Sequence, residues 1–335
     1  MTNGTSGSDL FVGTDGADEY FALNGNDTVA GLGGDDILDL GPGADTADGG
    51  EANDLMIGSA GNDTMRGGPG QDSLFGGTNL DNLGSGADEL SGGDGNDLVL
   101  GGDGNDEVYG EGGNDEVNGN TGADLVYGGA GTDFVRGGQS NDSVWGESDD
   151  DWHVNGNMGN DWVSAGDGND SAFGGQGNDL VYGDAGNDYM SGDFDDDTMV
   201  GGTGNDTIFG GQGHDSILGG TGDDSLTGGS GNDLLYGGTG IDHFVFGNGS
   251  GVDVIDDFNP ANEVLFLANN INSTAINTDG EALAACVAWG SATVIDLGDG
   301  HAVILLDTAP DELDGTNFSF YNPVDFGGGL VLEVI

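Results

Sequence analysis

Basic residues are almost missing from this chain of 335 residues, which has no lysine and only two arginines, Arg66 and Arg136. A protein that binds nucleic acid needs a cluster of positive side chains against the phosphates. An anionic membrane surface attracts the same kind of cluster. We therefore predict that the chain binds neither nucleic acid nor an anionic bilayer.

Cysteine and long apolar runs are also scarce. Cys286 is the single cysteine, so no disulfide can form within the chain. Residues 1–7 have neither the basic start nor the apolar core of a secretory signal peptide. No apolar stretch approaches the about 20 residues that span a bilayer. We expect neither a cleaved leader of this kind nor a transmembrane helix.

Signatures of hydrolases are missing as well. The four histidines, at positions 153, 214, 243 and 301, do not form a His-Glu-x-x-His zinc pair, and no Gly-x-Ser-x-Gly elbow is present. Gly-x-Gly-x-x-Gly strings occur only as by-products of a repeat and do not indicate a nucleotide site. We therefore expect no catalytic residues and no enzyme.

Acidic residues and glycine dominate what is present. The chain has 62 Asp and Glu, 74 Gly and a formal net charge of -60. Such a chain repels itself and should be largely disordered alone. A bound cation would have to cancel the charge for the chain to fold. Carboxylate and carbonyl oxygens are hard ligands, and they suit calcium best.

Aspartate recurs every nine residues through most of the chain. The unit reads Gly-Gly-x-Gly-x-Asp-x-apolar-x, as in residues 201–209. One series runs from Asp9 to Asp81, a second resumes at Asp88 after a two-residue deletion, and a third resumes at Asp161 after a one-residue insertion, giving 27 repeats in all. The last three positions predict a short strand with its middle side chain facing inward. Two units should make one coil of 18 residues, and stacked coils should bury a column of Val, Ile and Leu.

The predicted fold is therefore all-β, a parallel β-roll solenoid of about 13 coils with a β-rich cap at its C-terminal end. The unit resembles the RTX, or hemolysin-type, calcium-binding repeat. The resemblance covers residues 4–245 and implies that turns of neighbouring coils hold calcium through Asp oxygens and backbone carbonyls. About 20 ions would offset most of the formal charge. The implied metal ligands are Asp54, Asp63, Asp72, Asp88, Asp97, Asp106, Asp115, Asp124, Asp133, Asp142, Asp161, Asp170, Asp179, Asp188, Asp197, Asp206, Asp215, Asp224, Asp233 and Asp242.

The glycine pattern is broken before five other aspartates of the series. We expect these to be weaker ligands or only solvated turn formers. They are Asp9, Asp36, Asp45, Asp81 and Asp151. His153 falls on the inward position after Asp151, which predicts a bulge there.

The repeat ends after Asp242, which predicts an RTX roll over residues 1–245 and a separate segment over 246–335. Within that segment we expect strands over 263–267, 292–297, 302–306 and 317–321, a hairpin at Asp299-Gly300 and a helix over 279–289. Residues 244–246 and 251–258 resemble the C-terminal segment of the serralysin proteases, as residues 332–335 resemble the end of some exported substrates. In those proteases the segment caps the roll and carries an uncleaved type I secretion signal. The resemblance thus implies export by the type I secretion apparatus to an extracellular or cell-surface location.

Aromatic residues recur at the ninth position of alternate repeats. They are Tyr109, Tyr127, Trp145, Tyr182 and Tyr236, and their row should lie on one face of the roll with about 4.8 Å between coils. Two interpretations remain open. The row is an interaction surface for a cell surface, a glycan or a second copy of the chain, or it only stabilises the ladder of strands.

Together these features predict a secreted protein that folds on binding calcium outside the cell and has a structural or adhesive role. One alternative is a membrane-active RTX protein, against which the lack of a basic amphipathic segment argues. The other is a non-catalytic module that binds ice or a glycan. The threonines that would form an ice-binding array, at positions 121, 203, 221 and 239, are interrupted.

Overall fold

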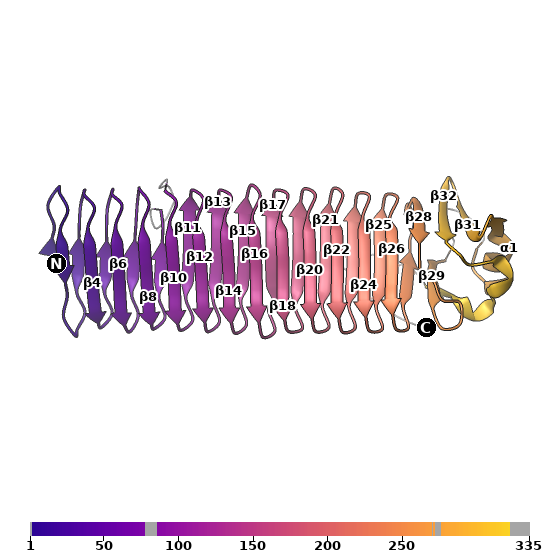
Figure 1. Ribbon diagram of the computed structural model, residues 1–335, viewed down its shortest axis with the longest axis horizontal. Helices are drawn as coiled ribbons and strands as arrows, with labels where there is room; N and C mark the ends of the chain where they lie inside the picture. Colours follow the sequence, from indigo (N-terminus) through magenta and orange to yellow (C-terminus); the bar gives the residue numbers. More distant parts are fainter. Residues whose placement is uncertain (1, 78–85, 270, 272–275, 322–335) are drawn as a thin grey trace. The chain divides into compact units, whose positions relative to one another are not determined.

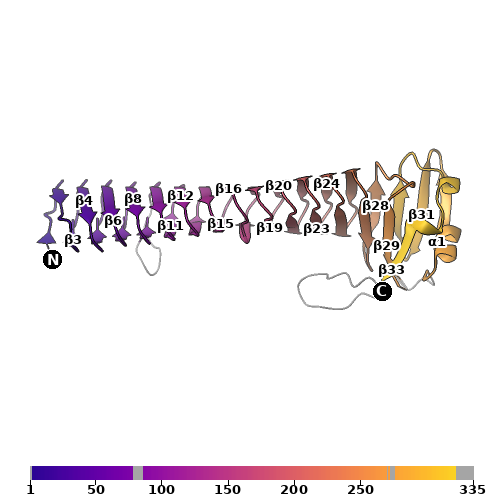
Figure 2. The same ribbon diagram turned by 90° about the horizontal axis from the view of Figure 1, so that it is seen from below.

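The computed structural model describes residues 2–77, 86–269, 271 and 276–321. The chain divides into two compact units, residues 1–179 (unit 1) and residues 180–335 (unit 2). The strands of the repeats are parallel and stack coil upon coil, as Figures 1 and 2 show for each unit. The fold is an all-β parallel solenoid of about 14 turns, which confirms the predicted fold class.

Unit 1 consists of two parallel sheets, because the chain reverses twice in every coil. The first sheet contains β1 (Thr2–Asn3), β3 (Glu19–Phe21), β5 (Ile37–Asp39), β7 (Leu55–Ile57), β9 (Ser73–Phe75), β11 (Leu98–Asp103), β13 (Glu116–Thr121), β15 (Phe134–Gln139), β17 (His153–Met158) and β19 (Ser171–Gln176). The second contains β2 (Leu10–Val12), β4 (Thr28–Gly33), β6 (Thr46–Glu51), β8 (Thr64–Pro69), β10 (Glu89–Asp94), β12 (Glu107–Gly112), β14 (Leu125–Ala130), β16 (Ser143–Ser148) and β18 (Trp162–Asp167).

Unit 2 continues the same pattern and then departs from it. One parallel sheet contains β21 (Tyr189–Phe194), β23 (Thr207–Gln212), β25 (Ser225–Ser230), β27 (His243–Phe246), β29 (Val264–Ala268) and β33 (Phe318–Tyr321). The other contains β20 (Leu180–Ala185), β22 (Thr198–Thr203), β24 (Ser216–Thr221), β26 (Leu234–Thr239), β28 (Val252–Ile255) and β32 (His301–Leu305). Two antiparallel strands, β31 (Ala292–Gly298) and β30 (Cys286–Trp289), extend this sheet from β32.

The core is a single column of apolar side chains in each sheet. In β12, β14 and β16 the central residues Val108, Val126 and Val144 lie in register and are fully buried. In β24 and β26 of unit 2, Ile217 and Leu235 occupy the same place. The prediction that the apolar residue two places after the repeat Asp faces inward is confirmed for these strands.

Strand length was predicted wrongly. Most repeat strands have six residues rather than three, because the Gly-Gly-x of the next unit continues the extended chain, as in β14. The glycine at the first position of the unit faces the interior, where it lies against the aspartate five residues later. A Cβ on Gly119 would come within 2.4 Å of Asp124 Oδ2.

The register between the first two series was also predicted wrongly. Met65 pairs with Leu90 and Leu74 pairs with Val99, each 25 residues apart, so the coil contains a seven-residue insertion rather than a two-residue deletion. Asp81 lies outside the described residues.

The C-terminal segment matches most of its predicted strands, and the hairpin at residues 299–300 joins β31 to β32. The predicted helix over 279–289 is half right. Helix α1 spans Asp279–Ala285, and the chain then becomes strand β30. Thr278 caps the helix by accepting the N–H of Glu281. Short 3-10 turns follow at Pro310–Glu312 and Gly315–Asn317. Residues 332–335 lie outside the described residues.

Candidate calcium sites along the turns

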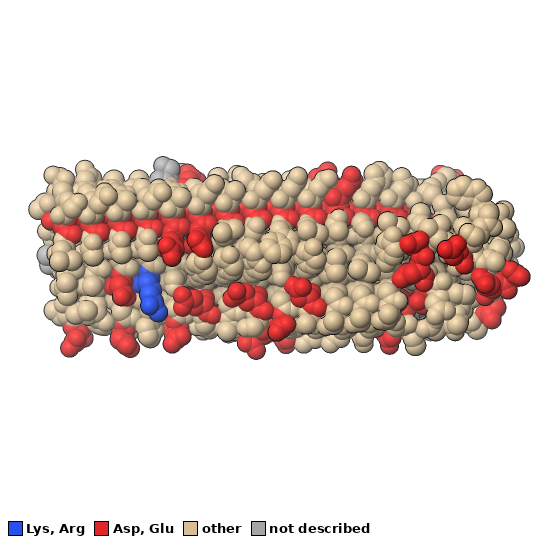
Figure 3. Space-filling model, in the orientation of Figure 1, with Lys and Arg blue, Asp and Glu red and all other residues tan. Residues whose placement is uncertain are grey.

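The repeat aspartates lie at the start of each strand, with their carboxylates turned inward beneath the turn. Figure 3 shows acidic side chains in a row along the turns of each unit. All twenty predicted ligands are buried, and none exposes more than 4% of its surface. Burial of this many carboxylates means that each one must find partners inside the turn.

One oxygen of nearly every carboxylate has such a partner. The Oδ1 atom accepts a hydrogen bond from the backbone N–H of the aspartate one coil earlier. Asp106 donates to Asp124 at 2.8 Å, and Asp124 donates to Asp142 at 2.9 Å. In unit 2, Asp206 donates to Asp224 at 2.9 Å. This carboxylate ladder fixes the side chains in one orientation along both edges of the roll.

The second oxygen, Oδ2, is buried without a hydrogen-bond partner in most of these residues. In unit 1 this holds for Asp27, Asp36, Asp45, Asp54, Asp63, Asp72, Asp97, Asp106, Asp115, Asp124, Asp133, Asp142, Asp151 and Asp161, and in unit 2 for Asp206, Asp215, Asp224, Asp233 and Asp242. An unpaired buried charge is strongly destabilising, so each Oδ2 requires either a proton or a cation.

Burial also shifts the acidity of these groups. The pKa of Asp106 and of Asp115 is raised to about 7, chiefly by burial and in part by the charges of neighbouring aspartates, although the ladder hydrogen bond lowers it. The pKa of Asp142 and of Asp151 is raised to about 8 for the same reasons. The metal-free turns therefore hold their protons unusually tightly.

The surroundings of Oδ2 suit calcium. Gly119 lies between Asp124 Oδ2 and the carbonyl oxygen of Gly137 in the next coil, and a Cβ there would come within 2.4 Å and 2.7 Å of them. Nowhere in the described part of the chain do three His, Cys, Asp or Glu side chains gather around one point. A bound ion would therefore take few carboxylates and fill its shell with backbone carbonyls, a set of oxygens that calcium accepts.

Most of the aspartates with a broken glycine pattern are not solvated turn formers. Asp36, Asp45 and Asp151 are as deeply buried as the others and take part in the same Oδ1 ladder. Their turns survive without the usual glycines because Leu32 and Asp149 adopt left-handed backbone conformations, with φ of 84° and 73°. Asp9 does differ, since it is only half-buried and its Oδ2 accepts the N–H of Thr5 at 2.6 Å.

Two further aspartates join the array outside the predicted ligand set. Asp27 is 2% exposed and accepts from Asp9. Asp253 is 1% exposed and accepts the N–H of Asp233 at 3.1 Å, across a step of 20 residues. The signal for Asp253 was present as Gly-x-Asp-x-apolar in residues 251–255, but the irregular step placed it in the C-terminal segment.

The bulge near Asp151 exists, but its details differ from the prediction. His153 pairs with Phe134 and faces outward, and the buried inward residue is Val154. The inserted residue is Trp152, which is 60% exposed. An extra residue in the turn leaves the strand register intact only if it bulges outward.

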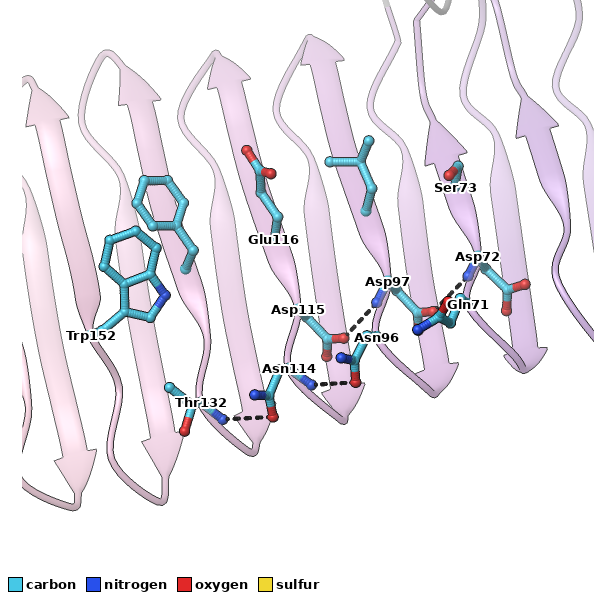
Figure 4. Close-up of a pocket in the computed structure, with 12 residues that line it drawn as sticks. Gln71, Asp72, Ser73, Asn96, Asp97, Asn114, Asp115, Glu116, Thr132 and Trp152 are labelled. Carbon is cyan, nitrogen blue, oxygen red and sulfur yellow. Dashed lines mark hydrogen bonds between the residues drawn. The ribbon is translucent and has the colours of Figure 1, made fainter.

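A second ladder runs along the outside of the turns. The residue before many of the aspartates, usually Asn, accepts through its side-chain oxygen from a backbone N–H one coil later. Asn105 accepts from Ala123 at 3.1 Å, and Asn205 accepts from Asp223 at 2.8 Å. Figure 4 shows this pattern at Asn96 and Asn114. This amide ladder points the opposite way to the carboxylate ladder.

The predicted aromatic row is present, and part of it is a stack of rings. Tyr109 and Tyr127 stack at 4.8 Å between centroids, and Tyr127 and Trp145 stack at 4.4 Å. In unit 2, Tyr182 lies in register with Val200 and Tyr236 with Leu218, so aliphatic side chains lie between these rings in the row.

The model of the RTX calcium-binding nonapeptide repeat matches the chain nine times, at residues 3–19, 12–47, 48–83, 82–117, 118–152, 155–190, 191–226, 209–244 and 218–255. No curated protein sequence matches the chain.

Two solved structures share some similarity. The AlgE6R3 subunit of the Azotobacter vinelandii mannuronan C5-epimerase is 26% identical with a TM-score of 0.33, over 43% of this chain and 88% of that one. The extracellular lipase LipA of Serratia marcescens is 17% identical with a TM-score of 0.25, over 79% of this chain and 39% of that one.

Proposed function

Because the chain belongs to the family of RTX calcium-binding nonapeptide repeat proteins, we propose that it is a secreted protein that folds when calcium fills its turns outside the cell. Extracellular calcium modules bind in the range of about 10⁻⁴–10⁻³ M, well above the calcium concentration inside a cell. The chain would then stay unfolded before export and fold after it.

The observation that carries this proposal is the set of buried Oδ2 atoms that lack a partner. The repeat aspartates and the nearby glycine carbonyls would hold the ions. Calcium supplies the positive charge that these carboxylates otherwise lack. The carboxylate ladder orients the ligands, and the inward glycines let the backbone approach. Because the sites form only when the chain folds, the free energy of calcium binding contributes directly to the free energy of folding.

We assign the protein a structural or adhesive role rather than a catalytic one. The repeats form a structural scaffold, and their acidic residues are engaged in the turns. No helix in the described residues is long and apolar enough to cross a membrane.

Circular dichroism at neutral pH tests the proposal. With EDTA the chain should be disordered, and millimolar calcium should produce a β spectrum. Magnesium should substitute poorly, because it requires a small octahedral site and keeps its water. A chain that is already folded in EDTA at pH 7.5 would contradict calcium-driven folding.

We further propose that residues 246–335 direct export by a type I apparatus. Deleting them should leave the protein inside the cell. A matched control deletes residues 107–142, two whole coils, and should still be exported. Normal secretion of the chain that lacks residues 246–335 would refute this assignment.

A further inference from the structure

A groove of about 690 Å³ crosses the turn edge of unit 1. It runs over the starts of β9, β11, β13 and β15 and ends at Trp152, as Figure 4 shows. Its wall consists of the residues that precede successive aspartates, namely Gln71, Asn96, Asn114 and Thr132, all of which are exposed. The groove therefore presents one polar side chain per coil.

The amides of this wall are held in a fixed orientation. Asn96 Oδ1 accepts the N–H of Asn114 at 3.1 Å, and Asn114 Oδ1 accepts the N–H of Thr132 at 3.3 Å. Because the oxygens are engaged, the amide NH₂ groups remain as donors. A ligand with many hydroxyl groups would find preoriented donors, about 4.8 Å apart from coil to coil.

Trp152 lies at one end of the groove, at the position where one extra residue interrupts the nine-residue repeat. It is the inserted residue of the bulge, it is 60% exposed, and one side of its ring lies against Phe134 with centroids 4.7 Å apart and planes tilted by 40°. A large indole ring that is exposed at the end of a polar groove indicates a binding surface, because its apolar area is otherwise costly to leave in water. It offers a flat surface to a ligand.

The charge of the groove selects among ligands. Asp72, Asp97 and Asp115 lie along its floor, where they would hold calcium in the folded roll, and no basic side chain lines it. Glu116 on its wall is already paired with Arg136 at 2.8 Å. A charged ligand would therefore find no opposite charge left to pair with, whereas an uncharged one needs none.

We propose that this groove binds an extended, uncharged polysaccharide. Sugar hydroxyls would accept from the amide donors of Asn96 and Asn114, and the apolar face of one sugar ring would stack on Trp152. The inference rests on the proposed function, because the groove exists only in the folded roll, and it supplies a ligand class for the adhesive role.

The test uses the full chain in millimolar calcium with cellohexaose, maltohexaose and mannohexaose as uncharged probes. Binding is followed by calorimetry and by tryptophan fluorescence. At least one probe should bind. Trp152→Ala should weaken that binding at least tenfold, whereas Trp289→Ala, which removes a tryptophan that is 67% exposed in unit 2, should leave it unchanged.

A second pair of variants tests the donors. Asn114→Asp keeps the side-chain oxygen that accepts from Thr132 and removes the NH₂ group, so binding should weaken about tenfold, the effect of losing roughly 1.5 kcal/mol. Asn205→Asp makes the same change in the amide ladder of unit 2 and should have no effect.

Circular dichroism of each variant separates the two proposals, because calcium-induced folding should persist in all of them. If the chain folds with calcium and no uncharged hexasaccharide binds, the groove assignment is wrong and the calcium proposal stands. Preferential binding of a hexauronate, or equal binding by Trp152→Ala and the parent chain, would also overturn it.

Discussion

At the scale of single residues, the two oxygens of a repeat carboxylate have different roles. Asp124 Oδ1 accepts from Asp106 at 2.8 Å, while its Oδ2 is buried without a partner. The hydrogen bond to Oδ1 needs no metal and would be kept if Asn replaced the Asp. The buried Oδ2 makes sense only with a proton or a cation. The two roles can therefore be separated by an isosteric substitution.

Asp124→Asn should keep the Oδ1 ladder and lose one calcium ligand. We expect calcium-induced folding to weaken by roughly 1–3 kcal/mol, seen as a higher calcium midpoint in circular dichroism. In EDTA the same variant should hold slightly more structure, because one buried charge is gone. Asp103→Asn, at the half-buried end of β11, is the control and should match the parent chain. Equal midpoints for the two variants would contradict the ligand role.

Gly119 limits how closely the turns can pack. In Gly119→Ala the new Cβ would come within 2.4 Å of Asp124 Oδ2 and 2.7 Å of the Gly137 carbonyl oxygen. Overpacking of this kind costs roughly 1–3 kcal/mol, so the melting temperature in calcium should fall. Gly112→Ala is the control, because its nearest atom would be 3.7 Å away. A similar melting temperature for both variants would show that the turn accommodates the new Cβ at no cost in stability, which contradicts the prediction.

At the scale of elements, the stacked rings on β12, β14 and β16 reinforce the pairing of these strands. Tyr127 lies between Tyr109 and Trp145, so both of its faces are covered and only the ring edges are open. Replacing Tyr127 by Thr keeps strand propensity and removes two stacks, each worth about 0.5–1.5 kcal/mol.

The expected result is a lower melting temperature for Tyr127→Thr than for Tyr236→Thr, whose neighbour in the preceding strand of its sheet is Leu218. Calcium-induced folding should persist in both variants. Light scattering in calcium shows whether the row also mediates self-association. If the two melting temperatures fall equally, the stack contributes no stability beyond burial of a single ring.

The period of nine allowed the elements to be predicted well, and the breaks in that period were where prediction failed. Val108 and Val126 could be placed in the core because the same spacing from Asp recurs in nearly every repeat. Trp152 and Asp253 could not, because an insertion changes register in a way that only the paired strands reveal. The six-residue strands were missed because glycine pairs indicate turns in most proteins, whereas here they continue the strand.

At the scale of the whole molecule, the buried carboxylates link folding to pH. The pKa of Asp106 is about 7 and that of Asp142 about 8 in the folded chain, against about 3.9 in an unfolded one. The folded state thus binds more protons between these values. Stability without metal is therefore greatest below about pH 4 and is lost as the pH rises through about 7–8.

We expect circular dichroism in EDTA to show more β structure at pH 5 than at pH 8.5. In calcium the dependence should reverse, because calcium needs the ionised carboxylate and competes with the proton. The calcium midpoint should fall as the pH rises from 5 to 8. An EDTA spectrum that does not change over this range would argue that the turns remain solvated.

The two opposed ladders give the roll a rule for changing its length. Each coil offers acceptors in both directions, through the carboxylate of Asp124 toward Asp106 and through the amide of Asn105 toward Ala123. Adding or removing 18 residues therefore returns every outward side chain to its own sheet. A change of nine keeps the aspartates in their places but exchanges the sheets, so that residues of the Tyr109 row would lie beside those of the Phe134 face. The roll can therefore lengthen or shorten by whole coils of two repeats without changing the pattern on either surface. Gain or loss of an odd number of repeats would keep the aspartates in place but would disrupt that pattern.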